Sequence, residues 1–446
     1  MLKLKRLLVA NRGEIAVRII RACRELGIET VAVYSTADAE SLPTRMADRA
    51  ICIGPPPAAK SYLLRESLIT AALRSGCEAI HPGVGFLSES AAFATDAADA
   101  GILFIGPRPE TLALLGDKIA ARREAKRQGL PVTPGTEDAV RDGEACLAAA
   151  REVGYPVIVK AAAGGGGKGM RIVRGPEEAA ESIALAQREA GAAFGDSRVF
   201  IERYVENPRH VELQLLGDGK GGAAALGERD CTVQKQHQKL IEESPSPGLS
   251  PAMREDMARG AVNLFRALKY QGAGTVEFLV QGDEFYFMEV NARLQVEHPV
   301  TEMVTGIDLV RQQVLACCEG RIEVDCAPRG AEPAWAERRG WAVECRINAA
   351  SPGKVTRLEV PGGPGIRFDS FLYPGCTVPP YYDALAAKVI AWAADRLSAL
   401  DRMDRALSEL VIEGLKTNQA EQRAIIKDEV FRGGHFGTEF YGSGKW

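Results

Sequence analysis

Short apolar runs and amphipathic stretches alternate along the first 115 residues. "RLLVAN" and "ETVAVYS" are typical of buried strands, and "GEIAVRIIRACREL" between them has apolar residues three and four apart, which predicts a helix. "RAICIG", "AIHPG" and "LFIGP" continue the strand series. Strands that alternate with helices indicate a parallel sheet with helices on its faces. The first turn, "ANRGEIA", lacks G-x-G-x-x-G, which disfavours a nicotinamide oxidoreductase.

The pattern changes at "GDKIAARREAKRQG", a predicted helix with Asp117 as N-cap and Gly129 as stop signal. "LPVTPG", "PVIVKA", "MRIVRG" and "RVFIERYV" predict short strands around the helix "PEEAAESIALAQREAG". We therefore expect a small α+β subdomain at about 132–204, inserted into a larger domain that continues to 325. "CAPRGAEPAWAERRG", from about 326, predicts a linker, and a last α+β region includes "WAVECRIN" and "KVIAWAAD".

Composition narrows the class of protein. The chain has 446 residues, 26% of them charged, and a net charge of −4, so no nucleic-acid partner is expected. No apolar run approaches the ~20 residues of a membrane span, which predicts no membrane partner. Ten cysteines without a CxxC pair favour free thiols in a reducing, cytoplasmic compartment. The basic run at 121–129 is interpreted as a solvated helix face.

A run of four glycines in "KAAAGGGGKGMR" lies between two predicted strands. It is not a P-loop, because Lys168 is followed by glycine. Strand, glycine loop and strand instead suggest a lid over nucleotide phosphates, with a ligand-free surface loop as the alternative. Lys160 ends the first strand and would find a partner in a phosphate. Lys118, after the predicted N-cap, could serve likewise or be a solvent-exposed lysine.

Carboxylates interrupt two apolar strands in "AGTVEFLVQGDEFYFMEVNARLQVEHPVTE". If the connecting loop has an odd residue count, Thr275, Glu277, Phe287 and Glu289 share one face, since side chains alternate. Glutamates in apolar strands are costly unless they meet a cation, and Mg²⁺ prefers carboxylate and amide oxygens. A row of solvated strand faces is the alternative. The residues that continue the alternation are Asn291, Arg293, Gln295 and Glu297.

The chain resembles the biotin carboxylase family over almost its whole length. The resemblance rests on "ANRGEIAVRIIRA", "HPGVGFLSES", "KAAAGGGGKGMR", "ERDCTVQKQHQKLIEESP", "MEVNARLQVEHPVTE", "AVECRINA" and "VPPYYD". It implies a multidomain α/β and α+β fold: a Rossmann-like N-terminal domain (1–115), an ATP-grasp domain (116–325) with a mobile lid, and a C-terminal biotin carboxylase domain (326–446). The implied reaction consumes ATP and bicarbonate, passes through carboxyphosphate, and carboxylates biotin on a carrier protein.

The resemblance also implies roles for individual residues. ATP would be bound by Lys118, Lys160, Gly166, Gly167, Glu202, Val205, His210, Gln234 and His237. Mg²⁺ or Mn²⁺ would be held by Glu277, Glu289 and Asn291, and bicarbonate by Lys239, Arg293, Gln295 and Val296. Glu297 would be the general base, and Arg346 would be the cation beside the biotin ureido oxygen. His81 and His298 are interpreted as structural.

Three departures from the family pattern affect the acceptor side and the dimer. Val84 stands where tyrosine is usual, the loop after Asn348 is about seven residues shorter than usual, and Pro364 replaces a phenylalanine of the dimer contact. A homodimer is still expected, since Arg21, Glu25 and Arg367 match its charged members. No Met-Lys-Met acceptor motif occurs, so we expect the carrier protein and the carboxyltransferase on separate chains, unless this chain is cut from a longer one. A ligase with a non-biotin acceptor and a non-catalytic nucleotide-binding subunit are the alternatives.

Overall fold

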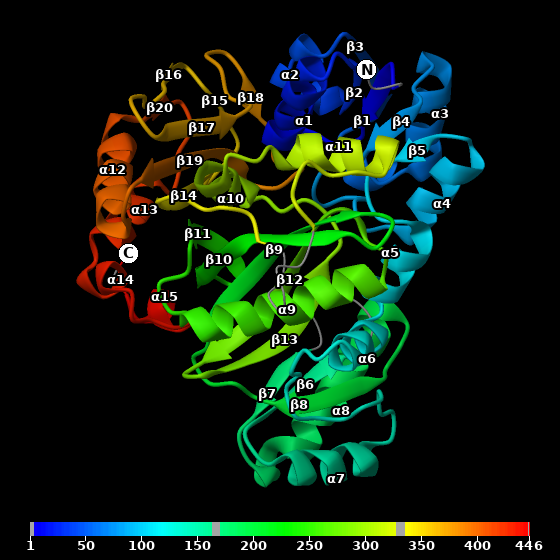
Figure 1. Cartoon of the computed structure of the whole chain (residues 1–446), viewed down its shortest axis with the longest axis vertical. Coiled ribbons are helices and arrows are strands. Elements are labelled where there is room, and N and C mark those ends of the chain that lie inside the picture. Colours follow the sequence, from blue (N-terminus) through cyan, green and yellow to red (C-terminus); the bar gives the residue numbers. More distant parts are fainter. Residues whose placement is uncertain (1–3, 163–169, 327–334, 445) are drawn as a thin grey trace.

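A five-stranded parallel sheet with strand order β3-β2-β1-β4-β5 forms the N-terminal unit of this computed structural model, which describes residues 4–162, 170–326, 335–444 and 446 (Figure 1). The parallel sheet confirms the interpretation of the alternating pattern. Ile15 and Ile19 of the first helix are buried against it. The elements are β1 (Arg6–Val9), α1 (Gly13–Glu25), β2 (Glu29–Ser35), α2 (Leu42–Met46), β3 (Arg49–Gly54), α3 (Arg65–Ser75), β4 (Ala79–His81), α4 (Ala91–Asp99), β5 (Leu103–Phe104) and α5 (Pro109–Gly116).

A small unit with its own apolar core lies at the far end of the molecule (Figure 1). Its antiparallel sheet has the order β7-β6-β8, with β6 (Val157–Ala161), β7 (Arg171–Val173) and β8 (Val199–Arg203). Two helices pack on it, α7 (Gly143–Val153) and α8 (Pro176–Phe194). The sequence analysis did not predict α7. The predicted strand "LPVTPG" is wrong: only isolated bridges form there, because Pro131 and Pro134 have no N–H to donate.

An eight-stranded antiparallel sheet, in the order β13-β12-β9-β10-β11-β14-β19-β17, is the centre of the molecule. Its strands come from both sides of the predicted linker, whose residues 327–334 lie outside the described range. The domain boundaries near 115 and 326 therefore stay predictions. The strands are β9 (Arg209–Asp218), β10 (Ala223–Lys235), β11 (Gln238–Ser244), β12 (Gln271–Gln281), β13 (Glu284–Asn291), β14 (Trp341–Asn348), β17 (Ile366–Ser370) and β19 (Leu385–Ala393).

Helices from three parts of the chain pack against this sheet. Asp117 accepts hydrogen bonds from the N–H groups of Ile119 and Ala120, which confirms it as an N-cap. No helix in the described part of the chain is long and apolar enough to cross a membrane. These helices are α6 (Lys118–Arg127), α9 (Pro251–Ala267), α10 (His298–Thr305), α11 (Leu309–Glu319), α12 (Arg396–Glu409), α13 (Gln419–Lys427) and α15 (Phe440–Ser443), and α14 (Glu429–Gly433) packs against α13. Short strands at the C-terminal side are β15 (Gly353–Lys354), β16 (Arg357–Glu359), β18 (Thr377–Val378) and β20 (Val411–Glu413).

The hairpin of β12 and β13 corrects the predicted alternation. Gln281 pairs with Glu284 across a two-residue turn, so the loop count is even and the turn alone would not bring Glu277 opposite Glu289. A β-bulge between Glu277 and Phe278 shifts the register by one residue, so Glu277 and Glu289 do pair. Phe287 pairs with Phe278 and lies in the apolar core. The prediction that Phe287 shares the glutamates' face is therefore wrong, because the bulge inserts one extra residue.

Candidate functional site

A cavity of about 1060 Å³ opens between the N-terminal unit, the small unit and the central sheet. Its walls include Asn11 and Val84 from the first unit, and Ile158 and Phe200 from the small sheet. The predicted site residues that line it are Lys118, Lys160, Glu202, Val205, His210, Gln234, His237, Lys239, Glu277, Glu289, Asn291, Arg293, Gln295, Val296, Glu297 and Arg346. Gly166 and Gly167 lie outside the described residues.

Two lysines stand at the end of the cavity that faces the small unit. Lys160 is on β6 and donates to Glu202 Oε2 at 2.5 Å, while Lys118 Nζ lies 3.7 Å from Glu289 Oε2. Arg122 also pairs with Glu202. Burial alone would raise the pKa of Glu202, yet Lys160 and Arg122 hold it below its usual value. At this end of the cavity, cationic side chains are therefore paired with carboxylates. Such a group of cations suits a polyanionic ligand.

A tight hairpin turn positions the next group of side chains. Lys235 pairs with Gln238, and the two residues between them, Gln236 and His237, have φ values of +51° and +63°. Positive φ at both positions matches the twist of a two-residue hairpin but is strained for side chains other than glycine. The turn brings His237 to the cavity and starts β11, on which the following lysine points inward.

Glu277 and Glu289 form the candidate metal site with Asn291. The two glutamates are a directly opposed cross-strand pair, and Asn291 follows on the same wall of the cavity. Burial raises the pKa of Glu289, and so does the facing carboxylate of Glu277. Two facing carboxylates with an amide oxygen match the donors that Mg²⁺ prefers. The residues present therefore fit a divalent cation, held together with ligand phosphates.

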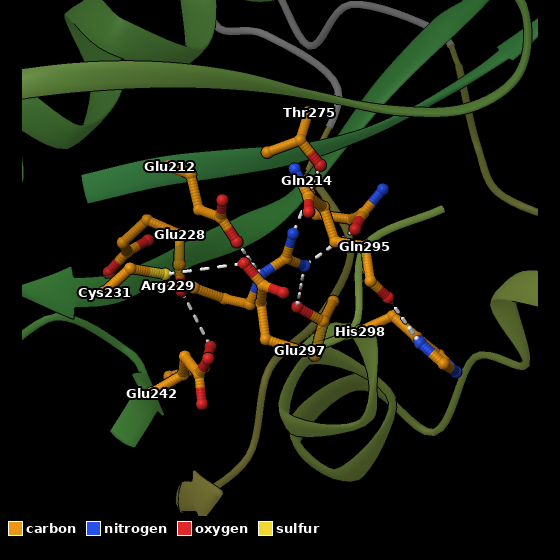
Figure 2. A network of polar contacts seen from close by, with 12 residues as sticks. Glu212, Gln214, Glu228, Arg229, Cys231, Glu242, Thr275, Gln295, Glu297 and His298 are labelled. Atoms are coloured by element: carbon orange, nitrogen blue, oxygen red, sulfur yellow. Dashed lines mark hydrogen bonds and ion pairs between the residues drawn. The ribbon is translucent and has the colours of Figure 1, made fainter. Parts of the chain in front are cut away.

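Lys239 is the centre of an ion-pair network on the sheet. Its Nζ donates to Glu212 Oε2 at 2.8 Å, Glu277 Oε1 at 2.9 Å and Glu297 Oε1 at 2.6 Å. Burial would lower the pKa of Lys239, but the surrounding acidic groups raise it well above its usual value. Figure 2 shows Arg229 paired with Glu212, with Glu297 close by. Lys239 therefore stays a cation in the interior.

Glu297 is fully buried at the start of α10 and is shared by two cations. Arg346 Nη2 donates to its Oε2 at 2.9 Å, opposite the contact with Lys239. Burial alone would raise the pKa of Glu297, but Lys239, Arg346 and Arg229 hold it well below the usual range. Glu297 is therefore ionised, which is the form a general base must have before it accepts a proton.

Arg293 and Gln295 extend this cationic region toward the cavity. Arg293 Nη1 donates to Gln295 Oε1 at 2.9 Å, and its Nε donates to Glu89 Oε2 at 3.0 Å. The backbone oxygen of Val296 accepts from Lys388 Nζ at 2.8 Å, which fixes that peptide. The Nε2 of Gln295 is buried and has no partner among the described residues. An orphaned donor beside a guanidinium favours an anion at this point.

Several residues that hold the site together were missed by the sequence analysis. Glu89 orients Arg293, and Glu212 binds both Lys239 and Arg229. Glu212 could have been found, since it is a glutamate in the apolar strand "HVELQLLGD". Arg122 corrects the interpretation of the basic run as a wholly solvated face, because it lines the cavity, whereas Lys126 is exposed.

A small unit that faces a carboxylate-bearing sheet across a lysine-lined cavity defines a protein of the ATP-grasp class. Comparisons identify the family. Residues 3–112 match the model of the biotin carboxylase N-terminal domain, residues 117–320 that of the ATP-binding domain of the carbamoyl-phosphate synthase L chain, and residues 344–442 that of the biotin carboxylase C-terminal domain. This chain belongs to the biotin carboxylase family.

Individual relatives match it over nearly their full length. A biotin carboxylase from a Nostoc species is 48% identical over 448 residues, which covers 98% of this chain and 99% of that protein. A structure of Campylobacter jejuni biotin carboxylase has a TM-score of 0.93 at 41% identity and covers 99% of both chains. The biotin carboxylase domain dimer of Hydrogenobacter thermophilus 2-oxoglutarate carboxylase has a TM-score of 0.92 at 42% identity, covers 99% of this chain and 98% of that one, and contains MgADP, ADP and bicarbonate.

Proposed function

We propose that this protein is a biotin carboxylase, which uses ATP and bicarbonate to carboxylate biotin on a carrier protein. The observation that carries the proposal is the Glu297 carboxylate, held between Lys239 at 2.6 Å and Arg346 at 2.9 Å in a cavity that also contains the nucleotide lysines and the carboxylate pair. The bicarbonate complex of the Hydrogenobacter thermophilus relative supports it.

In the first step, Glu297 acts as general base toward bicarbonate. Arg293, Gln295 and Lys239 bind the anion, and Glu297 removes its hydroxyl proton. An oxygen of the resulting carbonate attacks the γ-phosphorus of ATP, the bond to ADP breaks, and carboxyphosphate forms. Arg293 and Lys239 offset the negative charge that builds up around the attacking oxygen.

Lys118 and Lys160 bind the transferred phosphoryl group and the leaving ADP. Each lysine now pairs with a carboxylate, so ligand phosphates would replace the partners Glu289 and Glu202. Glu277, Glu289 and Asn291 are proposed to hold Mg²⁺, which would supply positive charge to the phosphate oxygens when bound. Gly166 and Gly167, which lie outside the described residues, are proposed to bind the ATP phosphates through their backbone N–H groups.

The second half-reaction transfers the carboxyl group to biotin. Carboxyphosphate breaks into CO₂ and phosphate, the phosphate takes the ureido N–H proton, and the ureido nitrogen forms a C–N bond with CO₂. Negative charge develops on the ureido oxygen, and Arg346 is the proposed cation that stabilises it. Arg346, on β14, lines the same cavity as Val84 and Phe86 of the N-terminal unit.

Phosphate release from Mg-ATP tests the proposal, measured without additions, with bicarbonate, and with bicarbonate plus free biotin. We expect stimulation by bicarbonate and a further increase with biotin, together with biotin-dependent fixation of labelled bicarbonate. A response to bicarbonate but none to free or carrier-linked biotin would favour another acceptor. No turnover under any condition would contradict the proposal and favour a nucleotide-binding subunit.

We also propose a homodimer, with the biotin carrier protein and the carboxyltransferase as further partners. Arg21 and Glu25 are exposed on α1 and Pro364 is exposed, as an interface requires. Arg367, in contrast, donates to Glu302 at 2.6 Å within its own chain. Light scattering with size-exclusion chromatography tests the dimer. A monomer at micromolar concentration would contradict it.

A further inference from the structure

One face of the central sheet carries a row of buried charged side chains beneath α10. The register puts Glu242 of β11 opposite Glu344 of β14, and Arg346 of β14 opposite Lys388 of β19. Glu344 and Arg346 are two residues apart on one strand, so their side chains point to the same face. Glu242, Glu344 and Lys388 have no exposed surface. Three of the four side chains therefore lie in the interior, and the fourth, Arg346, also lines the cavity.

Three of these four groups have ionic or hydrogen-bond partners. Arg346 donates from Nε to Glu242 Oε1 at 2.6 Å and from Nη2 to Glu297 Oε2 at 2.9 Å. Lys388 donates to the backbone oxygen of Val296 at 2.8 Å and lies 3.1 Å from Glu14 Oε2. Both cations are thus engaged with other acceptors.

Glu344 is the exception. Both of its carboxyl oxygens are buried, and neither accepts a hydrogen bond from any group in the described part of the chain. An ionised carboxylate without donors in the interior is far more costly than a neutral carboxylic acid. Glu242, directly opposite, accepts a hydrogen bond from Arg346 Nε, and two ionised carboxylates opposed across two strands would destabilise the sheet, so the carboxyl without a donor is the one favoured as neutral.

The charges around Glu344 act in both directions. Glu242 on β11 and Glu297 before α10 disfavour its ionisation, whereas Arg346 and Lys388 favour it. Burial is the largest influence, and the pKa of Glu344 is raised well above its usual value. Arg367 of β17, the next cation on this side of the sheet, pairs with Asp369 and Glu302.

We propose that Glu344 is a neutral carboxylic acid in the working enzyme and that it acts as a positioning residue for Arg346. As a neutral group it does not compete for the guanidinium, which can bind Glu242 and Glu297 together. Ionisation of Glu344 would add a carboxylate beside Arg346, and we expect this to draw the guanidinium away from Glu297. The protonation state of Glu344 does not depend on the proposed function, whereas its role in positioning Arg346 rests on that function.

Infrared difference spectroscopy tests the protonation state, because the C=O stretch of a carboxylic acid is separate from the bands of a carboxylate. We expect the spectrum of wild type minus Glu344→Gln at pH 7 to show one carboxylic acid band. Glu228→Gln is the control, since Glu228 is equally buried but pairs with Arg254 and Arg338. No such band in the first difference spectrum, or a band lost only in Glu242→Gln, would overturn the proposal.

The pH dependence of bicarbonate-stimulated ATP cleavage tests the positioning role. Glutamine imitates the neutral acid, so at pH 7 we expect Glu344→Gln to retain kcat within about threefold of wild type. Above pH 8 we expect the decrease of kcat with rising pH to occur about one pH unit higher in Glu344→Gln than in wild type. Superimposable pH profiles would overturn the role of Glu344 in positioning Arg346.

If Glu344→Gln does not fold, the wild-type spectrum gives the answer. A carboxylic acid band that persists from pH 6 to 8 in protein labelled with ¹³C at the glutamate carboxyl, and that remains when each other buried glutamate with a raised pKa is replaced in turn by glutamine, would support the proposal, and its absence would overturn it; these glutamates are Glu14, Glu212, Glu242, Glu243 and Glu289. The infrared measurements require no turnover. An inactive wild-type enzyme would therefore contradict the proposed function and leave the protonation state of Glu344 to be judged on its spectrum.

Discussion

Replacement of Glu297 by glutamine separates catalysis from binding at this site. The amide keeps the shape of the side chain and can still accept a hydrogen bond, but it cannot take a proton from bicarbonate. A positioned general base contributes about 10²–10⁴-fold to a rate, so we expect bicarbonate-dependent ATP cleavage to fall by about that factor. The nucleotide lysines, Lys118 and Lys160, are held elsewhere in the cavity, so ATP affinity should change little.

The structure also gives the stability cost of this change. Removing one partner of a buried ion pair typically costs about 3–5 kcal/mol. Lys239 keeps Glu212 and Glu277, and Arg346 keeps Glu242, so neither cation is left alone. We therefore expect Glu297→Gln to lose only about 1–3 kcal/mol of unfolding free energy.

Three measurements on Glu297→Gln check the reasoning: phosphate release with and without bicarbonate, ATP binding by calorimetry, and urea denaturation. Glu277→Gln is a useful comparison, since it removes another carboxylate from Lys239 but should weaken Mg-ATP binding. Bicarbonate-stimulated cleavage by Glu297→Gln within tenfold of wild type would refute the assignment of the base. A loss of ATP affinity would assign Glu297 to the nucleotide end.

Three further changes have separate readouts. Arg346→Ala should reduce biotin carboxylation at least about tenfold more than bicarbonate-dependent ATP cleavage; equal losses would move Arg346 to the ATP half-reaction. Glu289→Gln should raise the Mg²⁺ concentration needed for half-maximal ATP cleavage, and an unchanged requirement would contradict the metal site. Burial lowers the pKa of His81 to about 3, so the unfolded chain takes up a proton there below pH 6.5 and the folded protein does not. When the pH is lowered from 6.5 to 5, the unfolding free energy of His81→Gln should therefore decrease by about 2 kcal/mol less than that of wild type. Urea denaturation at the two pH values measures both decreases, and equal decreases would contradict the prediction.

Local signals predicted most of the elements. The apolar runs of the N-terminal unit became the five strands of the parallel sheet, and Asp117 caps α6 as expected. The failures have local physical causes. Two prolines removed the N–H groups that "LPVTPG" would need to join a sheet, and a β-bulge sent Phe287 to the core.

The candidate site was predictable where a polar residue interrupts an apolar run. Glu277 and Glu289 stood out because a carboxylate in a buried strand requires a cation, and the structure supplies Lys239 and Lys118. Glu89 and Arg122 gave no such signal. Each is a polar residue with polar neighbours in the sequence, and its role comes from a contact with a residue far away in the chain.

The amino-acid sequence by itself determined the periodicity of strands and helices, the N-cap at Asp117 and the family membership, because these depend on neighbouring residues or on continuous motifs. Only the tertiary structure decided which charges meet. Lys239, Glu297 and Arg346 come from three separate segments that the eight-stranded sheet and α10 bring within 3 Å. Glu344 received no partner from the described residues in the same packing. Long-range register sets such distances, and in a buried site distance decides whether a carboxylate is ionised or neutral.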